Sequence, residues 1–301
     1  MTVDTGTPSG MTVLVTGATG TVGGHVVGHL LAAGHKVRAM TRHPATADLP
    51  DGVEVVAGDL TDVSSLAPAF DGVTAAHLIN FGKGYQPLRN GPEIVAVALK
   101  AGIRKVTVLG GWEEGTLEPA VRASALEWTL LRPVEFMSNS LSDWGESLRT
   151  RGVVREPYGD RKSPPIHESD IAAVAAAVLT EDGHAGEAYH LTGPEVLTAR
   201  DKIRILAEAT GRDLTFEELT PEQTREEWVV RGGLPDLLIF KAFTGGNPGL
   251  GDAELMEILL RVYGTPNPYG TTVTDAVEKV IGRPPRTYAQ WAAEHAHHFQ
   301  P

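Results

Sequence analysis

Cysteine is absent from this 301-residue chain, which excludes disulfides, thiolate catalysis and cysteine-ligated metal sites. Because such a chain suits a reducing compartment, we expect it to be cytoplasmic. Clusters of Lys and Arg are absent too: 26 basic residues stand against 38 acidic ones, for a formal net charge of −12. Contacts to a phosphate backbone need grouped cations, so no nucleic-acid partner is expected.

Long apolar runs are also missing. The longest, Ile171 to Leu179, is too short to cross a bilayer, so we expect no membrane partner. Residues 1–10 have neither a basic region nor an apolar segment, which predicts a flexible polar tail rather than a signal peptide. The remaining composition, 42% hydrophobic and 21% charged, is ordinary for a globular protein with a sizeable core.

The most informative stretch that is present begins at Met11. Val13 to Val15 is typical of a strand buried on both faces, and Val22, Val26 and Leu30 follow at helical spacing. Between them lies a G-x-x-G-x-x-G pattern, in which missing Cβ atoms let backbone N–H groups approach a pyrophosphate. An ordinary strand-to-helix turn is the alternative, but the context on both sides favours a dinucleotide site. The predicted cofactor turn comprises Gly17, Ala18, Thr19, Gly20, Thr21, Val22 and Gly23.

Arg42 follows the second predicted strand, Lys36 to Met40. In NAD-binding folds an acidic side chain at this place holds the ribose 2′-hydroxyl, whereas arginine accommodates the 2′-phosphate of NADP. No acidic residue stands beside Arg42, so the sequence favours NADPH as the cofactor, with NADH possible. The alternative for Arg42 is a solvated loop residue.

Three further strands are predicted at Val53 to Val56, Ala75 to Ile79 and Lys105 to Leu109. In an open α/β sheet, ligands bind outside the carboxyl ends of the strands. The residues that follow the first two of these strands are therefore expected to contact the cofactor, near the adenine and near the nicotinamide ribose respectively: Asp59 and Leu60, then Asn80 and Phe81.

A sixth strand, Trp128 to Leu131, is expected to end at Arg132 and Pro133, because proline removes a backbone donor. The chain should then leave the sheet on the cleft side. The predicted substrate pocket combines residues after the fifth and sixth strands with one further histidine: Gly111, Trp112, Val134, Glu135, Phe136 and His167. For His167, a position in a surface turn is the alternative.

The alternation of strands and helices predicts an α/β fold with a doubly wound, Rossmann-type parallel sheet over residues 11–192. Within it, about 134–168 is expected to line the cleft, and Ser169 or Asp170 to cap a helix from Ile171 to Leu179. A change of composition after Gly193 predicts a smaller, mainly helical lid over 193–301. Some aromatic residues of this part are expected either to belong to its core or to face the cleft: Trp228, Phe240, Phe243, Tyr263 and Tyr269.

No metal site is expected. His25 and His29 share a helix face at a spacing that metal ligands use, but no H-E-x-x-H pattern accompanies them. Three further histidines lie at a terminus that we expect to be loose: His295, His297 and His298.

Several segments together resemble the NmrA-like branch of the atypical short-chain dehydrogenase/reductases. They are Thr16 to Gly23, Arg42-x-Pro44, Gly58 to Leu60, Ala101 to Val106, Leu126 to Pro133, Asp170 to Ala172 and Thr192 to Pro194. The resemblance runs from Met11 almost to the end of the chain. It implies a Rossmann domain that binds NAD(P)(H) and a smaller C-terminal part that closes the substrate cleft. It also implies either reduction of quinones, ketones or alkenes, or redox-sensing regulation.

The sequence departs from the wider superfamily at its catalytic residues, which are a Ser after the fifth strand and a Tyr-x-x-x-Lys on the next helix. Gly110-Gly111-Trp112 stands at the serine position, and the helix predicted over Leu117 to Ala125 has neither Tyr nor Lys. Tyr158 and Lys162 have the required spacing, but the prolines and glycines around them prevent a helix. We therefore assign no catalytic residue.

The resemblance and these departures predict an NADPH-dependent reductase of a small aromatic carbonyl or quinone. A positioned general acid typically contributes about 10²–10⁴-fold, so without one the substrate must supply its own acid or delocalise the developing charge. Because the family includes ketoreductases of aromatic polyketide antibiotics, an angucyclinone-type ketone is the specific hypothesis. An NADP(H)-binding redox sensor without catalysis is the alternative.

Overall fold

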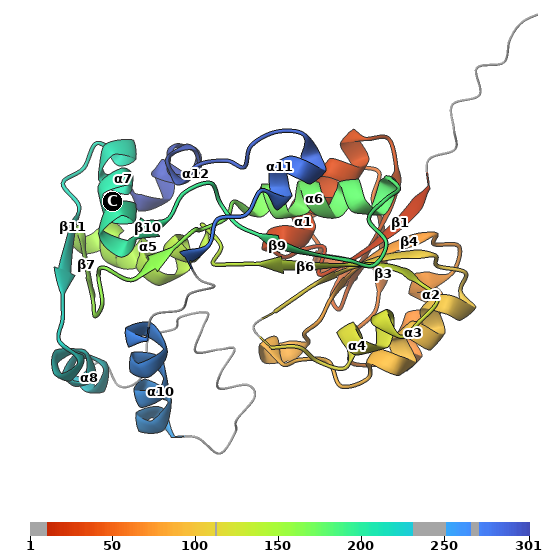
Figure 1. The fold of residues 1–301 in the computed structure, drawn as a ribbon, viewed down its shortest axis with the longest axis horizontal. Helices are drawn as coiled ribbons and strands as arrows, with labels where there is room; N and C mark the ends of the chain where they lie inside the picture. Colours follow the sequence, from red (N-terminus) through yellow and green to blue (C-terminus); the bar gives the residue numbers. More distant parts are fainter. Residues whose placement is uncertain (1–10, 112, 231–250, 266–270) are drawn as a thin grey trace, which may run out of the picture. The chain divides into compact units, whose positions relative to one another are not determined.

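The computed structural model describes residues 11–111, 113–230, 251–265 and 271–301 (Figure 1). The chain divides into two compact units. The first comprises Met1–Gly82, Pro87–Arg132 and Ile171–Tyr189, and the second comprises Lys83–Gln86, Pro133–Asp170 and His190–Pro301. The predicted flexible tail, residues 1–10, lies outside the described residues.

The strands are β1 Thr12–Thr16, β2 Lys36–Thr41, β3 Glu54–Ala57, β4 Ala75–Ile79, β5 Lys105–Leu109, β6 Glu127–Pro133, β7 Val153–Glu156, β8 Lys162–Ser163, β9 Glu187–Leu191, β10 Leu197–Thr198 and β11 Thr215–Glu218. The α-helices are α1 Thr21–Ala32, α2 Leu66–Phe70, α3 Gly91–Lys100, α4 Leu117–Arg122, α5 Asn139–Arg151, α6 Glu168–Thr180, α7 Ala199–Thr210, α8 Pro221–Val230, α10 Asp252–Gly264, α11 Ala276–Ile281 and α12 Tyr288–His295. Short 3-10 helices are η1 Pro44–Thr46, η2 Val63–Ser65, η3 Lys83–Tyr85 and η5 Ala296–Phe299.

Seven strands form the central sheet in the order β3-β2-β1-β4-β5-β6-β9. The pairs from β3 to β6 are parallel. The strands β6 and β9 also run in one direction, because Gly186 N donates to Trp128 O and Val134 N donates to Leu191 O. The strand order reverses between β1 and β4, and this reversal creates the crevice where such sheets bind ligands. The predicted Rossmann-type fold is confirmed.

Helices cover both faces of this sheet. Figure 1 shows α2, α3 and α4 on one face and α1 and α6 on the other. On the first face, Phe70, Leu78, Ile94 and Leu117 belong to one buried apolar cluster. On the second, the apolar stripe of α1 that the sequence predicted is buried at Val22, Val26 and Leu30. Burial on both faces explains the continuous apolar runs of the central strands.

The second unit has a core of its own. It is formed mainly by α5, α7 and α12, with the parallel pair β7 and β11 and the antiparallel pair β8 and β10. Its fully buried aromatic residues include Tyr288, Trp291 and Phe299. The helix α7 begins at Ala199, where Thr198 and Asp201 form a reciprocal capping box. No helix in the described part of the chain is long and apolar enough to span a membrane.

Two local predictions were wrong. The helix α6 begins at Glu168, so Ser169 and Asp170 lie in its first turn instead of capping it. From its position in the first turn of α6, the fully buried Asp170 accepts hydrogen bonds from Arg283 and Arg286. The C-terminal histidines do not belong to a loose terminus, because α12 and η5 contribute Trp291 and Phe299 to the core and Arg212 donates to Phe299 O.

Candidate cofactor site and active site

The turn between β1 and α1 exposes the backbone groups that a pyrophosphate would need. Gly17 has a φ of +63°, and Gly20 N donates to Gly17 O at 2.9 Å. Gly20 is the N-cap of α1, and the first turn has neither a side-chain cap nor an acidic residue. Thr19, Gly20 and Thr21 are exposed. The N–H groups and positive dipole of the first turn are therefore available to an anion.

Three other predicted residues of this turn, Ala18, Val22 and Gly23, are buried, and Gly17 is half-buried. Ala18 is fully buried and Val22 is nearly so. A Cβ added to Gly23 would overlap Gly17 O, so the helix can approach the turn only with glycine at this position. Among the seven residues, Thr19, Gly20 and Thr21 are therefore exposed to a ligand, and Ala18, Val22 and Gly23 pack inside the protein.

The side chain of Thr16 holds β1 and β4 together where the strand order reverses. Its Oγ1 donates to His77 O at 3.0 Å and accepts from Ile79 N at 3.1 Å. Both bonds are buried or partly buried. Because Gly17 directly follows Thr16 and Asn80 directly follows Ile79, this hydroxyl fixes the two borders of the crevice.

Arg42 and Asp59 follow β2 and β3 at the same edge. The Arg42 side chain is exposed and makes no hydrogen bond or ion pair within the described ranges. Asp59 Oδ1 accepts from Thr61 N at 2.9 Å and from Thr61 Oγ1 at 2.8 Å, which leaves its second oxygen for another donor. The adjacent Leu60 is buried at 4% exposure. The phosphate contact of Arg42 and the adenine contacts of Asp59 and Leu60 stay predictions.

Asn80, predicted to face the nicotinamide ribose, turns its side chain into the protein. It is 1% exposed, and Oδ1 accepts from Gly111 N at 2.7 Å. Nδ2 donates to Glu113 O at 3.1 Å and to the carboxylate of Glu118. Both amide hydrogens are thus used within the chain, which leaves the partly buried Phe81 and the backbone to meet a ligand at this strand end.

The segment after β5 is fixed at several points. Gly110 N donates to Leu131 O at 2.8 Å, and Gly115 N donates to Glu118 Oε2 at 3.1 Å. Glu114 Oε1 accepts from Arg122 and Arg132, both at 2.6 Å. The Arg122 hydrogen bond is the main cause that lowers the pKa of Glu114, so this carboxylate stays charged. Trp112, predicted in the substrate pocket, lies outside the described residues.

The surroundings of Gly111 leave little room for a side chain. A Cβ added there would lie 2.9 Å from Asn80 Oδ1 and 3.1 Å from the Phe81 ring. A serine at this position would therefore require the amide of Asn80 or the ring of Phe81 to shift.

In the second unit, Val134, Glu135 and Phe136 lie directly after β6 and are partly buried. Both carboxylate oxygens of Glu135 accept a hydrogen bond. Lys202 Nζ donates to Oε1 at 2.6 Å, and Ser163 Oγ donates to Oε2. Burial alone would raise the pKa of Glu135, but the charges of Lys202 and Arg161 outweigh it and lower the pKa to about 2. Glu135 is thus a charged, anchored carboxylate.

Lys202 belongs to a polar cluster that sequence reasoning missed. Its ammonium lies 5.4 Å from the centre of the Trp144 ring, and Trp144 Nε1 donates to Glu156 Oε1 at 2.8 Å. Burial raises the pKa of Glu156 to about 7 and that of Asp143 to about 6. Lys202 lies far from the other members in the sequence, so no local spacing signalled the cluster.

His167 is buried at 3% exposure, which excludes the surface-turn alternative. Its Nδ1 accepts from Ser169 N at 3.1 Å, so the proton lies on Nε2, which is 3.2 Å from Glu294 Oε2. The imidazole therefore links α6 and α12 within the second unit. A pocket role for it stays a prediction.

Tyr158 and Lys162 do not lie on a common helix in the described structure. Tyr158 has a φ of +59° and lies outside any helix, whereas Lys162 belongs to β8. A Cβ added to Gly264 would lie 2.8 Å from the Tyr158 hydroxyl oxygen, so the ring packs against the end of α10. This agrees with the expectation that their spacing is a coincidence.

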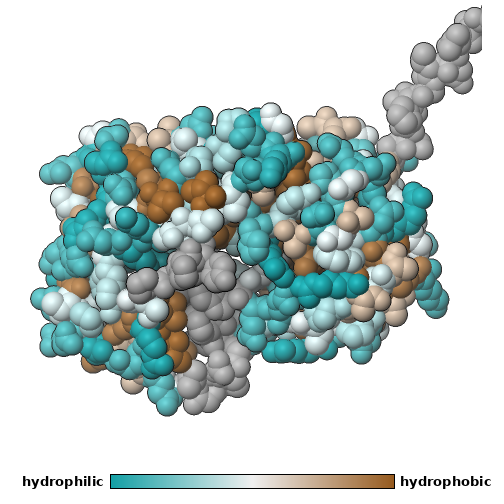
Figure 2. Space-filling view, viewed as in Figure 1, coloured by the Kyte–Doolittle hydropathy of each residue, from teal (hydrophilic) through white to brown (hydrophobic). Residues whose placement is uncertain are grey.

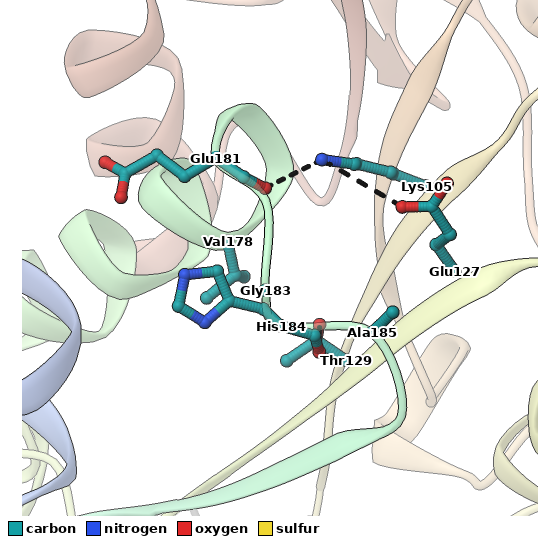
Figure 3. A pocket seen from close by; sticks show the side chains of 8 residues that line it. All are labelled: Lys105, Glu127, Thr129, Val178, Glu181, Gly183, His184 and Ala185. Carbon is teal, nitrogen blue, oxygen red and sulfur yellow. Dashed lines mark hydrogen bonds and ion pairs between the residues drawn. The ribbon is translucent and has the colours of Figure 1, made fainter.

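Figure 3 shows a small hollow at the opposite edge of the sheet, where β5 and β6 begin with Lys105 and Glu127. Lys105 Nζ donates to Glu181 O at 2.7 Å, and the cavity volume is about 10 Å³. That is room for about one water molecule, far too little for a dinucleotide. The described residues contain no group of three or more side chains suited to a metal ion.

Comparisons with known proteins agree with the fold and the turn. The NmrA-like family matches residues 9–108. A (4-alkanoyl-5-oxo-2,5-dihydrofuran-3-yl)methyl phosphate reductase of Streptomyces griseus is 37% identical, covering 96% of this chain and 99% of its own. The chain belongs to the NmrA-like family. Another relative of this NmrA-like protein, the NAD(P)H azoreductase of Xenophilus azovorans, is 31% identical and covers 95% and 99%.

Solved structures show the same fold. The triphenylmethane reductase of Citrobacter sp., complexed with NADP(H), has a TM-score of 0.73 at 24% identity and covers 95% of this NmrA-like protein and 100% of its own chain. The quinone oxidoreductase QOR2 of Escherichia coli has a TM-score of 0.70 at 23% identity, with 94% and 98% covered. The relatives identify this NmrA-like protein as an NAD(P)H-dependent oxidoreductase.

Proposed function

We propose that this NmrA-like protein transfers hydride from NADPH to a small, conjugated acceptor, foremost an aromatic carbonyl or a quinone. The observation that carries this proposal is the packing at Gly111, where Asn80 Oδ1 would lie 2.9 Å from an added Cβ. A serine there would crowd the Asn80 amide, and Tyr158 and Lys162 lie outside a helix. The acceptor must therefore stabilise its own developing negative charge.

The residues at the carboxyl edge of the sheet fit the cofactor. The exposed turn at Thr19, Gly20 and Thr21 would hold the pyrophosphate, and Arg42, exposed and unpaired within the described ranges, would bind the 2′-phosphate. Asp59 and Leu60 would contact the adenine, and Phe81 would lie beside the nicotinamide ribose. Bound NADPH would supply the hydride, and the protein's part is to orient the two reactants.

The substrate class follows from chemistry that the named relatives share. Azo compounds, quinones and a 2,5-dihydrofuran bearing oxo and alkanoyl groups are all conjugated acceptors. Each can spread the charge that arrives with hydride over several atoms, which reduces the need for a positioned acid. An angucyclinone-type ketone flanked by a phenolic hydroxyl belongs to the same class and is our specific proposal for a substrate of antibiotic biosynthesis.

A redox sensor that binds NADP(H) without catalysis is the second candidate. The same absent serine and Tyr-Lys helix support it, because a sensor needs no proton donor. The two candidates differ in one respect only: the sensor binds NADPH but transfers no hydride.

Stopped-flow oxidation of NADPH with hydroxylated quinones, azo dyes and aryl ketones tests the proposal, with simple aliphatic ketones as controls. We expect the conjugated acceptors to be reduced and the aliphatic ketones to react poorly. Tyr158→Phe and Lys162→Ala should keep turnover within about threefold of the parent, since neither residue is placed to donate a proton. Tight NADPH binding without any reduction would favour the sensor, and loss of activity in Tyr158→Phe alone would identify a misplaced acid.

A further inference from the structure

Asn80 connects three elements at the carboxyl edge of the sheet. It follows β4 at the strand-order reversal, accepts from Gly111 N and donates to Glu113 O and to Glu118. The orientation of the amide is fixed, because the Gly111 N–H can only donate and the Glu113 carbonyl can only accept. The buried side chain thus ties β4 to Gly111, to Glu113 and to α4.

Glu118 completes the connection. It is 3% exposed, and its two oxygens accept from Asn80 Nδ2 and from Gly115 N. It forms no ion pair with any cation in the part of the chain that the structure describes. Burying a carboxylate costs free energy unless hydrogen bonds compensate for the lost water. For Glu118 this compensation comes from the hydrogen bonds that Asn80 and Gly115 donate.

The ends of the segment between β5 and α4 are fixed as well. Gly110 N donates to Leu131 O, and Thr116 N donates to Leu88 O, both at 2.8 Å. Between these ends, the glycine at 111 permits direct contact with the Asn80 amide, as the crowding of an added Cβ shows. The described residues on either side of position 112 are therefore held by hydrogen bonds at the edge where Rossmann sheets bind their ligands.

We propose that Asn80 and Glu118 are positioning residues for hydride transfer, which fix Gly111, Glu113 and Gly115 as part of the substrate-side wall beside the nicotinamide. This inference rests on the proposed reductase function. Neither side chain touches the reactants: both act through the backbone of Gly111, Glu113 and Gly115. A misplacement of about 1 Å at a reacting centre can cost about 10²-fold in rate, so loosening this wall should slow the chemical step.

The test uses Asn80→Ala and Glu118→Gln, with turnover expressed per NADPH-binding site. We expect kcat to fall about 10- to 100-fold while the NADPH dissociation constant changes by less than about threefold. Glu93→Gln is the matched control, because Glu93 occupies the first turn of the neighbouring α3 but is exposed. It should leave kcat unchanged.

Asn80→Asp supplies a readout that a merely structural role would not affect. Above neutral pH the new carboxylate would repel Glu118 and could not donate to it. As the pH falls, a proton shared between the two carboxyl groups would restore the donor. We therefore expect kcat per site in this variant to rise on acidification, in a range where the parent protein shows no such rise.

The outcomes separate the two proposals. Parental kcat per site in both Asn80→Ala and Glu118→Gln, or a flat pH profile for Asn80→Asp, would overturn the positioning role and leave the reductase intact. If the parent protein reduces no acceptor, the reductase proposal fails and this inference fails with it. If Asn80→Ala does not fold, Glu118→Gln, which keeps the side-chain shape, decides the matter.

Discussion

Arg42 is the residue on which cofactor choice depends. Its guanidinium is exposed, and no carboxylate within the described ranges pairs with it, so it remains available for a phosphate. A charge-assisted hydrogen bond to the 2′-phosphate is worth about 1.5–3 kcal/mol, or roughly 10- to 100-fold in affinity.

We therefore expect Arg42→Ala to weaken NADPH binding by that factor and to leave NADH binding nearly unchanged. Titrations of both cofactors check this, with Arg104→Ala as the control, because Arg104 is exposed just before β5 at the opposite edge of the sheet. An unchanged ratio of the two affinities in Arg42→Ala would remove Arg42 from the site.

Two neighbouring glycines allow a matched test of the cofactor turn. A Cβ on Gly23 would overlap Gly17 O, whereas a Cβ on Gly24 would lie 3.6 Å from Ala18 O, an ordinary contact. Gly23→Ala should abolish NADPH binding by displacing α1 from the turn. Gly24→Ala should bind NADPH normally and melt no lower than the parent, because alanine favours a helix over glycine by about 1 kcal/mol. Equal NADPH affinities in the two variants would show that the turn does not bind the cofactor.

At the scale of elements, Asp170 anchors the segment between α11 and α12 to the start of α6. Its fully buried carboxylate accepts from Arg283 Nη2 at 2.7 Å, and from the backbone and side chain of Arg286 at 2.6 Å and 2.5 Å. Removing one partner of a buried ion pair leaves the other charges unsatisfied.

Asp170→Asn should therefore lower the free energy of unfolding by about 3 kcal/mol in urea titrations. The control is Asp275→Asn, which removes an exposed ion pair with Lys279 at 3.0 Å and should change stability by less than about 1 kcal/mol. Equal losses in both variants would contradict the anchoring role.

The elements that carry the cofactor turn could be predicted from the sequence because their signals are local. The run Val13 to Val15 and the spacing of Val22, Val26 and Leu30 required a buried strand and an amphipathic helix, and both exist. The start of α6 was misjudged because the partners of Asp170 lie more than a hundred residues away. The direction of the Asn80 side chain could not be predicted for the same reason: Glu118 has no sequence pattern that links it to β4.

At the scale of the whole molecule, the sequence predicted the α/β class and the family correctly. The division into a cofactor domain and a lid over 193–301 stays a prediction, as do the roles of the pocket residues. The predicted lid residues Phe240, Phe243 and Tyr269 lie outside the described residues, and so does the side chain of Trp228. The cluster around Glu135, Lys202 and Glu156 arises only from folding, and it makes stability depend on pH.

The sign of that dependence follows from the raised pKa of Glu156, about 7, against an ordinary value of 4.5. The stability that it contributes is fully present below about pH 4.5 and is lost as the pH rises through about 7. Glu135, whose pKa is lowered to about 2, has the opposite sign but loses its contribution only as the pH falls through about 2. Between pH 5 and pH 8 the Glu156 effect should therefore prevail.

In the parent protein the free energy of unfolding should fall between about pH 5 and pH 8. We expect this fall to be smaller by about 1–3 kcal/mol in Glu156→Gln, whose side chain can still accept a hydrogen bond from Trp144. Urea titrations at several pH values check this, with Glu146→Gln as the control on the exposed side of α5. The prediction fails if the Glu156→Gln and parent curves have the same slope over this range.

The central claim is that the protein transfers hydride directly from NADPH to a conjugated acceptor. NADPH deuterated at the transferring position of C4, incubated with an aryl ketone or a hydroxylated quinone, tests it most directly by mass spectrometry and single-turnover rates. We expect a primary isotope effect on cofactor oxidation with both acceptors and, in the ketone product, one deuterium on the former carbonyl carbon. NADPH that stays bound and unoxidised, with no deuterium in any product, would contradict the account and leave a protein that only senses its cofactor.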